Sequence, residues 1–482
     1  MHKKALLALL LVMAMFLTGC TLIEKDLEVD RATEIIRVGD TVYTKGEIQD
    51  ETDYQLNYMA YYYSMFGMSY DPTDAATVAE MQQSVIDSFV QTSVCSDKIA
   101  ELGLDQLTEE EQTELDAAVE ETWAYYQENV TASYFADTTL TGEELDSAVL
   151  AKMEELGVTR ESVTEYEKSI ITSDKLREYV IANVAVTDEE LQASYDKKVE
   201  EDKTYYENYP SSYGARVNNG TVVYYRPAGY RMVKQILVKF TEEDQALLDS
   251  IEDAISEQET LVSSYTNTLT ELGVTDVPAL LAQVNVTMEQ TATVTDLATV
   301  TDITANFDEG TSEEIITAAT SLAEAQAKID FLNSQLDQAK AQAFANIDAQ
   351  ADDILAQLAS GADWDTLMAE KTEDPGMQEG AATAATGYAV SAATTNMDTA
   401  FLSAAMALEN VGDVSPKTEG IYGYYIIQYT SAVEEGAVDL SDVQDSLSAS
   451  LLSEKQDTTY DETVAQWVSE ADVKIDYNAL KD

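Results

Sequence analysis

The N-terminal part of the chain has the hydrophobic spacing of consecutive helices. A stretch from Tyr54 to Tyr70 is rich in tyrosine and methionine, and an apolar pattern through Met81 to Leu102 ends at Gly103, a favourable helix C-cap. Thr108 with three following glutamates begins another helix, because acidic residues are favoured at the positive end of a helix. Upstream, the pattern of 35–47 predicts a strand, a Gly-Asp turn, a second strand and a helix start.

The segment 241–350 carries two long helical stripes. The first stripe alternates steps of four and three residues, with Gln258 in the seam, and consists of Ile251, Ile255, Val262, Tyr265, Leu269 and Leu272. The second stripe runs from about Glu313 through Leu322, Ala325, Ile329, Leu332, Leu336, Ala339, Ala343 and Ile347, and can continue into Ile354 and Leu358. Between them, 284–310 is rich in threonine and valine without a clear period. The pattern predicts an antiparallel, coiled-coil-like helical hairpin inserted into the second domain. A rigid spacer or arm is its simplest role, and a client-binding surface is the alternative.

The C-terminal part predicts helices followed by one strand. Apolar positions from Val438 to Leu452 mark an amphipathic helix, and a further helix is expected around Trp467. Val473–Tyr477 alternates strictly, so it needs a sheet partner, and we expect that partner to be 35–38 or 42–43. Residues 200–228, rich in tyrosine, asparagine and glycine, are expected to form a linker with a short hairpin.

Length and charge limit the possible functions. A chain of 482 residues with 45% hydrophobic residues is expected to form two or three domains with well-developed cores. The formal net charge of −63, from 90 acidic and 27 basic residues, argues against nucleic acid as a partner, because phosphate binding needs clustered lysine and arginine. A general surface adaptation explains this charge more simply than a specific basic partner.

The N-terminus resembles a bacterial lipoprotein signal. Met1–Lys4 is basic, Ala5–Phe16 is apolar, and Leu17–Cys20 matches a lipobox that ends in the cysteine to be acylated. The apolar run is too short to cross roughly 30 Å of hydrocarbon, and no later run reaches transmembrane length. We therefore expect residues 1–19 to be removed and lipid on Cys20 to anchor the chain to the outer face of the bacterial cytoplasmic membrane.

Cysteine and histidine usage excludes several site types. With Cys20 acylated, Cys95 has no partner for an internal disulfide, and its helical, apolar surroundings favour a buried small side chain over a nucleophile. The one histidine, His2, lies in the predicted signal. Histidine metal sites and Ser/His or Cys/His catalysis are therefore excluded, and we expect no metal and no cofactor.

Motifs along the chain resemble the PrsA- and SurA-type extracytoplasmic foldases, which carry a parvulin-type peptidyl-prolyl isomerase domain. The resemblance starts at Ile35–Glu47 and continues at Val186–Tyr195. The parvulin pattern begins at Gly229–Phe240 and resumes over 351–429, with the helix ending Gly361–Trp364 and the strand Gly423–Gln428. The family has a histidine on each of two adjacent strands, and here Gln235 and Tyr425 occupy these positions.

The resemblance also implies site residues. Asp374 stands as the acidic member beside Gln235 and Tyr425, and these three are the tentative catalytic residues. The proline pocket of the family corresponds to Met397, Phe401 and Met406, and Tyr422 lies near the hydroxyl position. Glutamine and tyrosine can form hydrogen bonds but do not reproduce imidazole tautomers, so isomerase activity is expected to be reduced or lost.

Together these patterns predict an α+β protein. A mostly helical chaperone domain (35–228), completed by the C-terminal segment (431–482), follows a tether (20–34). A parvulin-like α/β domain (229–430) carries the helical insert (241–350). The expected function is that of a membrane-anchored foldase for unfolded or newly translocated secreted proteins. The alternative is a non-catalytic surface lipoprotein that uses the fold as a peptide-binding or assembly scaffold.

The Tyr54–Tyr70 stretch is open to two interpretations within this function. A core helix followed by a loop is favoured for any single residue. Alternatively, methionine and tyrosine side chains, which adapt to many shapes, form a surface for unfolded clients.

Overall fold

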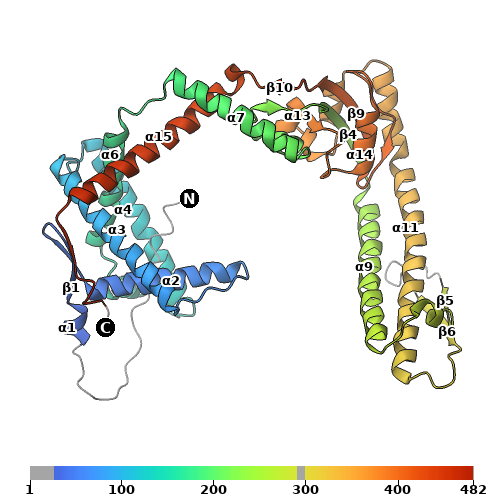
Figure 1. Cartoon of the computed structure of the whole chain (residues 1–482), viewed down its shortest axis with the longest axis horizontal. Coiled ribbons are helices and arrows are strands. Elements are labelled where there is room, and N and C mark those ends of the chain that lie inside the picture. Colours follow the sequence, from blue (N-terminus) through green and yellow to red (C-terminus); the bar gives the residue numbers. More distant parts are fainter. Residues whose placement is uncertain (1–26, 290–298, 481–482) are drawn as a thin grey trace. The chain divides into compact units, whose positions relative to one another are not determined.

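The chain forms two compact units, which are described separately. The computed structural model describes residues 27–289 and 299–480. One unit comprises residues up to Asp188 together with Ser448–Asp482, and the other comprises Glu189–Leu447. Long helices and small antiparallel sheets make up both units, which confirms the predicted α+β class (Figure 1). The expected signal (1–19), Cys20 and the tether as far as residue 26 lie outside the described residues.

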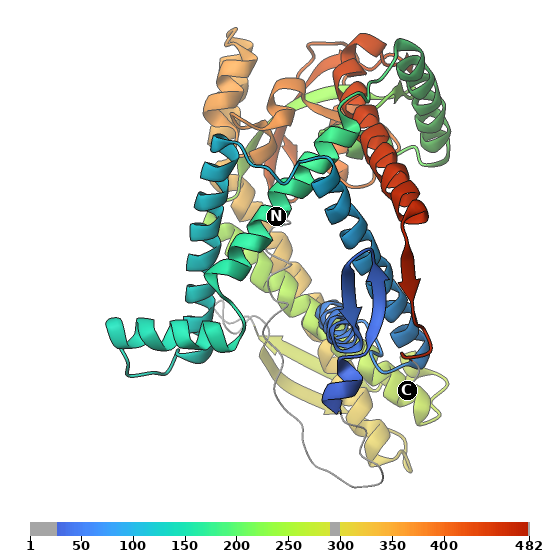
Figure 2. The same ribbon diagram turned by 90° about the vertical axis from the view of Figure 1, so that its left-hand side faces the viewer.

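In the first unit, a three-stranded antiparallel sheet has the order β11-β1-β2. It contains β1 (Glu34–Val38), β2 (Thr41–Thr44) and the C-terminal β11 (Val473–Ile475). Ile36 pairs with Ile475 and Val38 with Val473, so the predicted pairing of the C-terminal strand with 35–38 is confirmed (Figure 2). Ile35, Ile36 and Val38 are almost fully buried, and β11 covers the edge of β1 that would otherwise expose unpaired backbone groups.

Besides residues 448–470, which belong to a long C-terminal helix, five helices make up most of the described remainder of the first unit. They are α2 (Lys45–Met65), α3 (Ala75–Glu101), α4 (Glu109–Tyr134), α5 (Glu143–Glu155) and α6 (Arg160–Ile181), after a short α1 (Leu27–Arg31). Thr44, Thr108 and Thr159 each form a capping box, so the threonine start signals define where these helices begin. Two cores result, one around Ile36 and Val90 and one around Val130 and Met153.

The second unit is built on a four-stranded antiparallel sheet with the order β7-β4-β9-β8. Its central strands are β4 (Arg231–Lys239) and β9 (Gly423–Ala432), flanked by β7 (Tyr388–Val390) and β8 (Thr418–Glu419). The β4–β9 register places Gln235 opposite Ile427 and Leu237 opposite Tyr425. Because side chains alternate along a strand, Gln235, Leu237 and Tyr425 share one face of the sheet.

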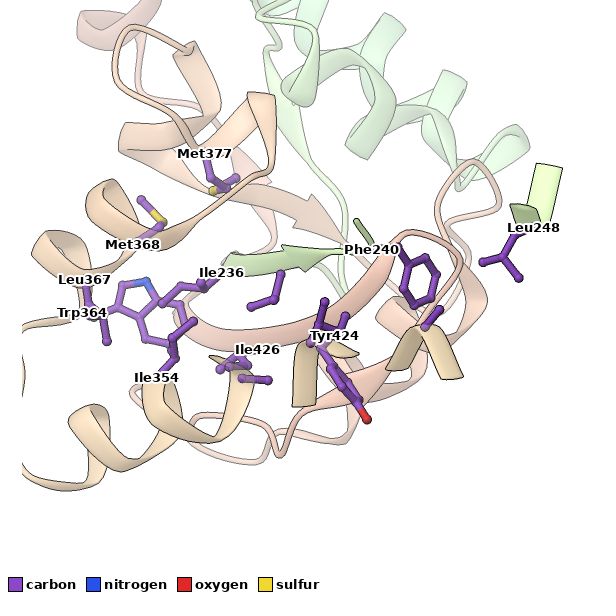
Figure 3. Packing of buried hydrophobic residues seen from close by; sticks show 14 residues of the cluster. Ile236, Phe240, Leu248, Ile354, Trp364, Leu367, Met368, Met377, Tyr424 and Ile426 are labelled. Atoms are coloured by element: carbon purple, nitrogen blue, oxygen red, sulfur yellow. The ribbon is translucent and has the colours of Figure 1, made fainter. Parts of the chain in front are cut away.

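The opposite face of this sheet carries a core that joins the sheet to three helices. Ile236 and Ile426 pack there against α11 (Glu313–Ala359) and α12 (Trp364–Lys371). Trp364 and Leu367 lie at one end of the cluster, and Phe240 and Leu248 lie at the other, where α9 (Glu242–Glu271) begins (Figure 3). This core therefore fixes the root of the insert to the sheet.

The insert is a pair of antiparallel helices with a small sheet at its far end. Asn346 of α11 donates hydrogen bonds to Asp244 near the start of α9, and Lys340 is 3.1 Å from Glu252. At the far end Leu269 packs with Leu322. The stretch without a clear period contains a short helix, α10 (Val277–Leu281), and a hairpin of β5 (Val284–Glu289) and β6 (Thr299–Ala305) (Figure 1). The β-branched residues of 284–310 favour strands, although the hydrophobic runs in this segment are too short to predict a strand from the sequence.

Residues 200–228 differ from the expected linker. Most of this segment is helical, in α7 (Asp188–Asn208) and α8 (Ser212–Asn218), and β3 (Tyr225–Arg226) pairs with β10 (Gly436–Ala437). Tyr206, Tyr213 and Tyr230 form a buried cluster with Ala389 of β7. A Cβ on Gly214 would lie 2.6 Å from the Ala389 carbonyl oxygen, so α8 approaches the sheet through a glycine. The tyrosines form a core, and the second unit therefore starts near residue 189, where 229 was expected.

The C-terminal helices also differ from expectation. The two predicted helices are one continuous α15 (Leu440–Glu470), and the boundary between the units falls within it at 447/448, where 430 was expected. Among the helices in the described ranges, none has the length and apolarity needed to cross a bilayer.

Candidate functional site

A cavity of about 1290 Å³ opens on the face of the second unit's sheet that carries Gln235 and Tyr425. Its walls come from β4, from α14 (Thr399–Ala407) with the loop before it, from the β8–β9 turn and from the first turns of α9. The volume exceeds the roughly 300–1,000 Å³ of an ordinary small-molecule site. Several residues of an extended peptide therefore fit into it.

The apolar floor of the cavity is an aromatic triplet. The ring of Phe401, only 4% exposed, lies between Tyr388 and Tyr425. Its centroid is 6.4 Å from Tyr388 and 5.6 Å from Tyr425, with interplanar angles of 87° and 79°. Both contacts are the edge-to-face arrangement that aromatic rings prefer. The neighbouring Met397 is half-buried against the same cluster.

Asp374 is a buried carboxylate at one side of this floor. It accepts hydrogen bonds from Gln235 Nε2 at 2.6 Å, from the Tyr388 hydroxyl at 3.1 Å and from the Gly376 backbone N–H at 2.9 Å. Its own backbone N–H donates to Thr372, whose hydroxyl also accepts a bond from Leu237 N–H in β4. The edge of β4 therefore positions the carboxylate.

Asp398 is the second carboxylate of the cavity, on the other side of Phe401. It caps the N-terminus of α14 through the Ala400 N–H at 2.7 Å. Its other oxygen accepts from the Tyr425 hydroxyl at 2.9 Å and from the Ile421 N–H at 2.8 Å. The cap of α14, the β8–β9 turn and β9 thus meet at one side chain.

Both tyrosines of the floor are held in the neutral, donating form. Burial raises the pKa of Tyr425 above its ordinary value, and the bond to Asp398 raises it further. Burial likewise raises the pKa of Tyr388, with Asp374 as the second cause. Because each phenol faces a carboxylate, it remains a hydrogen-bond donor throughout the physiological pH range.

Two glycines cover these tyrosines closely. A Cβ on Gly376 would lie 1.9 Å from the Tyr388 hydroxyl oxygen, and a Cβ on Gly420 would lie 1.9 Å from the Tyr425 ring. Neither position tolerates a side chain without displacement of its tyrosine. The absence of side chains at Gly376 and Gly420 therefore allows Tyr388 and Tyr425 to occupy their positions in the floor.

The structure brings together six of the seven side chains expected at the site. Gln235, Asp374, Met397, Phe401, Tyr422 and Tyr425 line the cavity, and Tyr422 is exposed at its mouth. Met406 does not line it and instead packs behind Phe401 in the α14 core. The expected residues do not form a single hydrogen-bond network. Gln235 and Tyr388 both donate to Asp374, whereas Tyr425 donates to Asp398.

Tyr388 and Asp398 were not expected from the sequence. Asp398 precedes an apolar helix pattern as an N-cap residue, so its local role was detectable, but its bond to Tyr425 depends on the fold. Within the described ranges no cluster of three or more histidine, cysteine, aspartate or glutamate residues is arranged to hold a metal ion. The site thus offers an apolar floor, neutral hydrogen-bond donors and two fixed carboxylates.

A helical unit combined with an α+β unit that holds a peptide-sized apolar cavity is the arrangement expected of the extracytoplasmic foldase class. No protein-family model matches the chain. Two curated proteins, each named foldase protein PrsA, from two strains of Clostridium perfringens, are 25% identical over 198 residues, which are 40% of this chain and 52% of the relative. The chain spans about half the length of these curated relatives. They confirm the resemblance to PrsA/SurA-type foldases that the motifs indicate.

Solved structures of PrsA and of SurA-like chaperones also match at low identity. PrsA from Bacillus subtilis is 14% identical with a TM-score of 0.21, and the match covers 94% of this chain and 98% of that chain. PrsA from Streptococcus pneumoniae is 13% identical with a TM-score of 0.24, covering 93% and 97%. A structure from work on the SurA-like chaperones PEB4 and Cj1289 of Campylobacter jejuni is 12% identical with a TM-score of 0.23, covering 73% and 94%. At these TM-scores no residue role is transferred from them to this chain.

Proposed function

We propose that this protein is a membrane-anchored extracytoplasmic foldase that binds unfolded segments of secreted proteins. The cavity over Phe401 is the observation that carries the proposal, because it combines an apolar floor with buried hydrogen-bond donors in a volume suited to a peptide. In this proposal the lipid on Cys20 anchors the chain to the outer face of the cytoplasmic membrane, where translocated clients emerge.

Prolyl isomerisation explains why such a cavity is useful. The barrier is the loss of amide resonance, about 18–20 kcal/mol, and uncatalysed X-Pro bonds take tens to hundreds of seconds to isomerise. A site accelerates this step when it binds the twisted amide better than the planar forms. The ring of a bound proline would rest on Phe401 and Met397, with the phenols of Tyr388 and Tyr425 as nearby donors.

The rate of this step is expected to be low. Each donor at the floor is already bonded to a carboxylate, so a twisted amide must compete with Asp374 or Asp398 for it. We therefore propose that peptide binding is retained while isomerase activity is reduced or lost relative to histidine-containing relatives of the parvulin type.

An exposed apolar surface on the first unit supports a chaperone role. At the end of α2 and in the following loop, Tyr61 is 64% exposed, Phe66 61%, Met65 58% and Met68 50%. These residues favour the client-surface interpretation of the Tyr54–Tyr70 stretch, since they are not part of a core. In this proposal the surface holds unfolded chains while the cavity binds individual segments.

The test uses the chain from residue 21 onward, the form expected after processing. Two readouts are needed: cis-trans exchange of an X-Pro peptide by NMR, and aggregation of a denatured secreted protein. We expect aggregation to be suppressed and exchange to be slow but faster than in buffer, or absent. If neither readout differs from buffer, the foldase proposal is wrong and the scaffold alternative is favoured.

A pair of variants locates the binding site. Phe401→Leu keeps an apolar side chain but removes the flat ring surface, and Tyr425→Phe keeps the ring but removes the hydroxyl. We expect Phe401→Leu to weaken peptide binding more than Tyr425→Phe, because the apolar floor supplies most of the binding free energy. The reverse order would place the binding site elsewhere.

A further inference from the structure

The walls of the cavity carry more negatively than positively charged side chains. Its charged lining residues are Asp249, Glu252, Asp374, Asp398 and Glu419 against Lys239 and Lys340. Lys340 is paired with Glu252 at 3.1 Å. Four carboxylates therefore face the cavity with one further lysine, so the potential inside it is negative.

A buried amide oxygen points to the same kind of ligand. Gln235 is only 8% exposed and lines the cavity, and its Oε1 accepts no hydrogen bond although its Nε2 is bonded to Asp374. An acceptor that is buried without a partner costs free energy until a donor reaches it. The N–H groups of an extended peptide, or a cationic side chain, are such donors.

The root of the insert contributes the outer wall of the cavity. Gln245, Leu248, Asp249 and Glu252 lie on the first turns of α9, and Gln245 Nε2 donates to Asp249 at 2.7 Å. Opposite them, Glu419 belongs to β8 beside Tyr424, whose ring contacts Phe344 of α11. Asp249 and Glu419 are both exposed, so a ligand can reach them without rearrangement of the core.

We propose that the α9 side of this cavity selects peptides that carry a lysine or arginine near the segment held over Phe401. This inference rests on the proposed function, because it assigns a preference for basic peptides to the same cavity. In this proposal the first turns of α9 (residues 245–252) contribute to peptide specificity, while the parts of α9 and α11 farther from the sheet act as a spacer.

The test measures binding of three labelled peptides by fluorescence anisotropy at low salt. The peptides share one Ala-Pro core and differ in a single residue, placed two or three positions away, which is lysine, glutamine or glutamate. We expect the lysine peptide to bind about three- to five-fold more tightly than the glutamine peptide, as one or two partly exposed ion pairs would produce. The preference should shrink as salt is raised, since exposed charges are screened.

Two double variants separate the local wall from the overall charge. Asp249→Asn with Glu419→Gln should reduce the lysine preference, measured as the ratio of the two dissociation constants, to less than about two-fold. Glu257→Gln with Glu259→Gln removes the same charge from exposed positions of α9 that do not line the cavity, and should retain the preference.

The outcomes distinguish this inference from the proposed function. If all three peptides bind equally, or if both double variants reduce the lysine preference to the same extent, the inference is overturned, whereas the proposed binding of peptides in the cavity is retained. If none of the peptides binds, both the inference and the proposed function are overturned.

Discussion

Replacement of Asp374 tests whether the buried carboxylate holds the cavity wall together. Asp374→Ala removes the common acceptor of Gln235, Tyr388 and Gly376. Each hydrogen bond to a charged group contributes about 1.5–3 kcal/mol, and the loss is partly offset because burial of the carboxylate itself costs several kcal/mol. We expect a net destabilisation of the second unit by about 2–4 kcal/mol.

Asp374→Asn is the matched variant with a different expectation. Asparagine keeps the volume and one acceptor oxygen, and its new amide can donate to Gln235 Oε1 once the Gln235 amide turns over. The hydrogen bond between the two side chains is then kept with its direction reversed, and Gln235 Nε2 takes the position in which Oε1 has no partner. The cost should therefore stay below about 1.5 kcal/mol.

The assay must report on the second unit alone, because two units need not unfold in one transition. Of the three tryptophans, Trp364 lies in the core of the second unit, and Trp123 and Trp467 belong to the first. Urea unfolding followed by Trp364 fluorescence in a Trp123→Phe, Trp467→Phe background gives the required free energies.

The same urea-unfolding assay is applied to a control variant. Asp353→Ala, at an exposed position of α11, should change the free energy of unfolding by less than about 0.5 kcal/mol. If Asp374→Asn destabilises as much as Asp374→Ala, the unpaired Gln235 oxygen does not accept the new donor. If Asp374→Ala destabilises by less than about 1 kcal/mol, the carboxylate does not organise the wall.

Three further predictions follow from the structure. Gly420→Ala should displace the Tyr425 ring and weaken peptide binding several-fold in anisotropy titrations. Gly412→Ala strains a backbone with a φ of +95° but lies outside the cavity lining, so it should lower stability and leave binding unchanged. The folded-state pKa of Tyr425 is raised above its ordinary value of 10.0, so the stability that the neutral phenol provides is complete below pH 10 and is lost as the pH rises further. Tyr425→Phe should therefore flatten the alkaline loss of stability in urea titrations, and an unchanged alkaline limb would contradict the assigned burial. Removal of residues 472–482 deletes β11 and should lower the stability of the first unit, seen by Trp467 fluorescence, without affecting that of the second unit, seen by Trp364.

Local chemistry in the sequence predicted many of the helices and strands. A threonine start located the beginning of α4, and the glycine at 103 located the end of α3, because caps act within one turn. The strict alternation of Val473–Tyr477 indicated a strand that needs a partner, and the sequence left 35–38 and 42–43 as candidates, of which the structure shows 35–38. Six of the expected site residues line one cavity, and these were expected from the resemblance to the foldase family, not from their spacing along the chain.

Only the tertiary structure decided which groups meet. The bonds of Gln235 and Tyr425 to different carboxylates depend on the sheet register and on the turn at Gly420, which no local pattern encodes. The tyrosines of 200–228 form a core because α8 packs on β7, so a segment with the composition of a linker belongs to the folded domain. Likewise, α9 became a wall of the cavity because Phe240 and Leu248 fix its first turns beside the sheet. Contacts between residues far apart in the chain set these features, and a hydrophobic pattern records only that a face is buried, not what buries it.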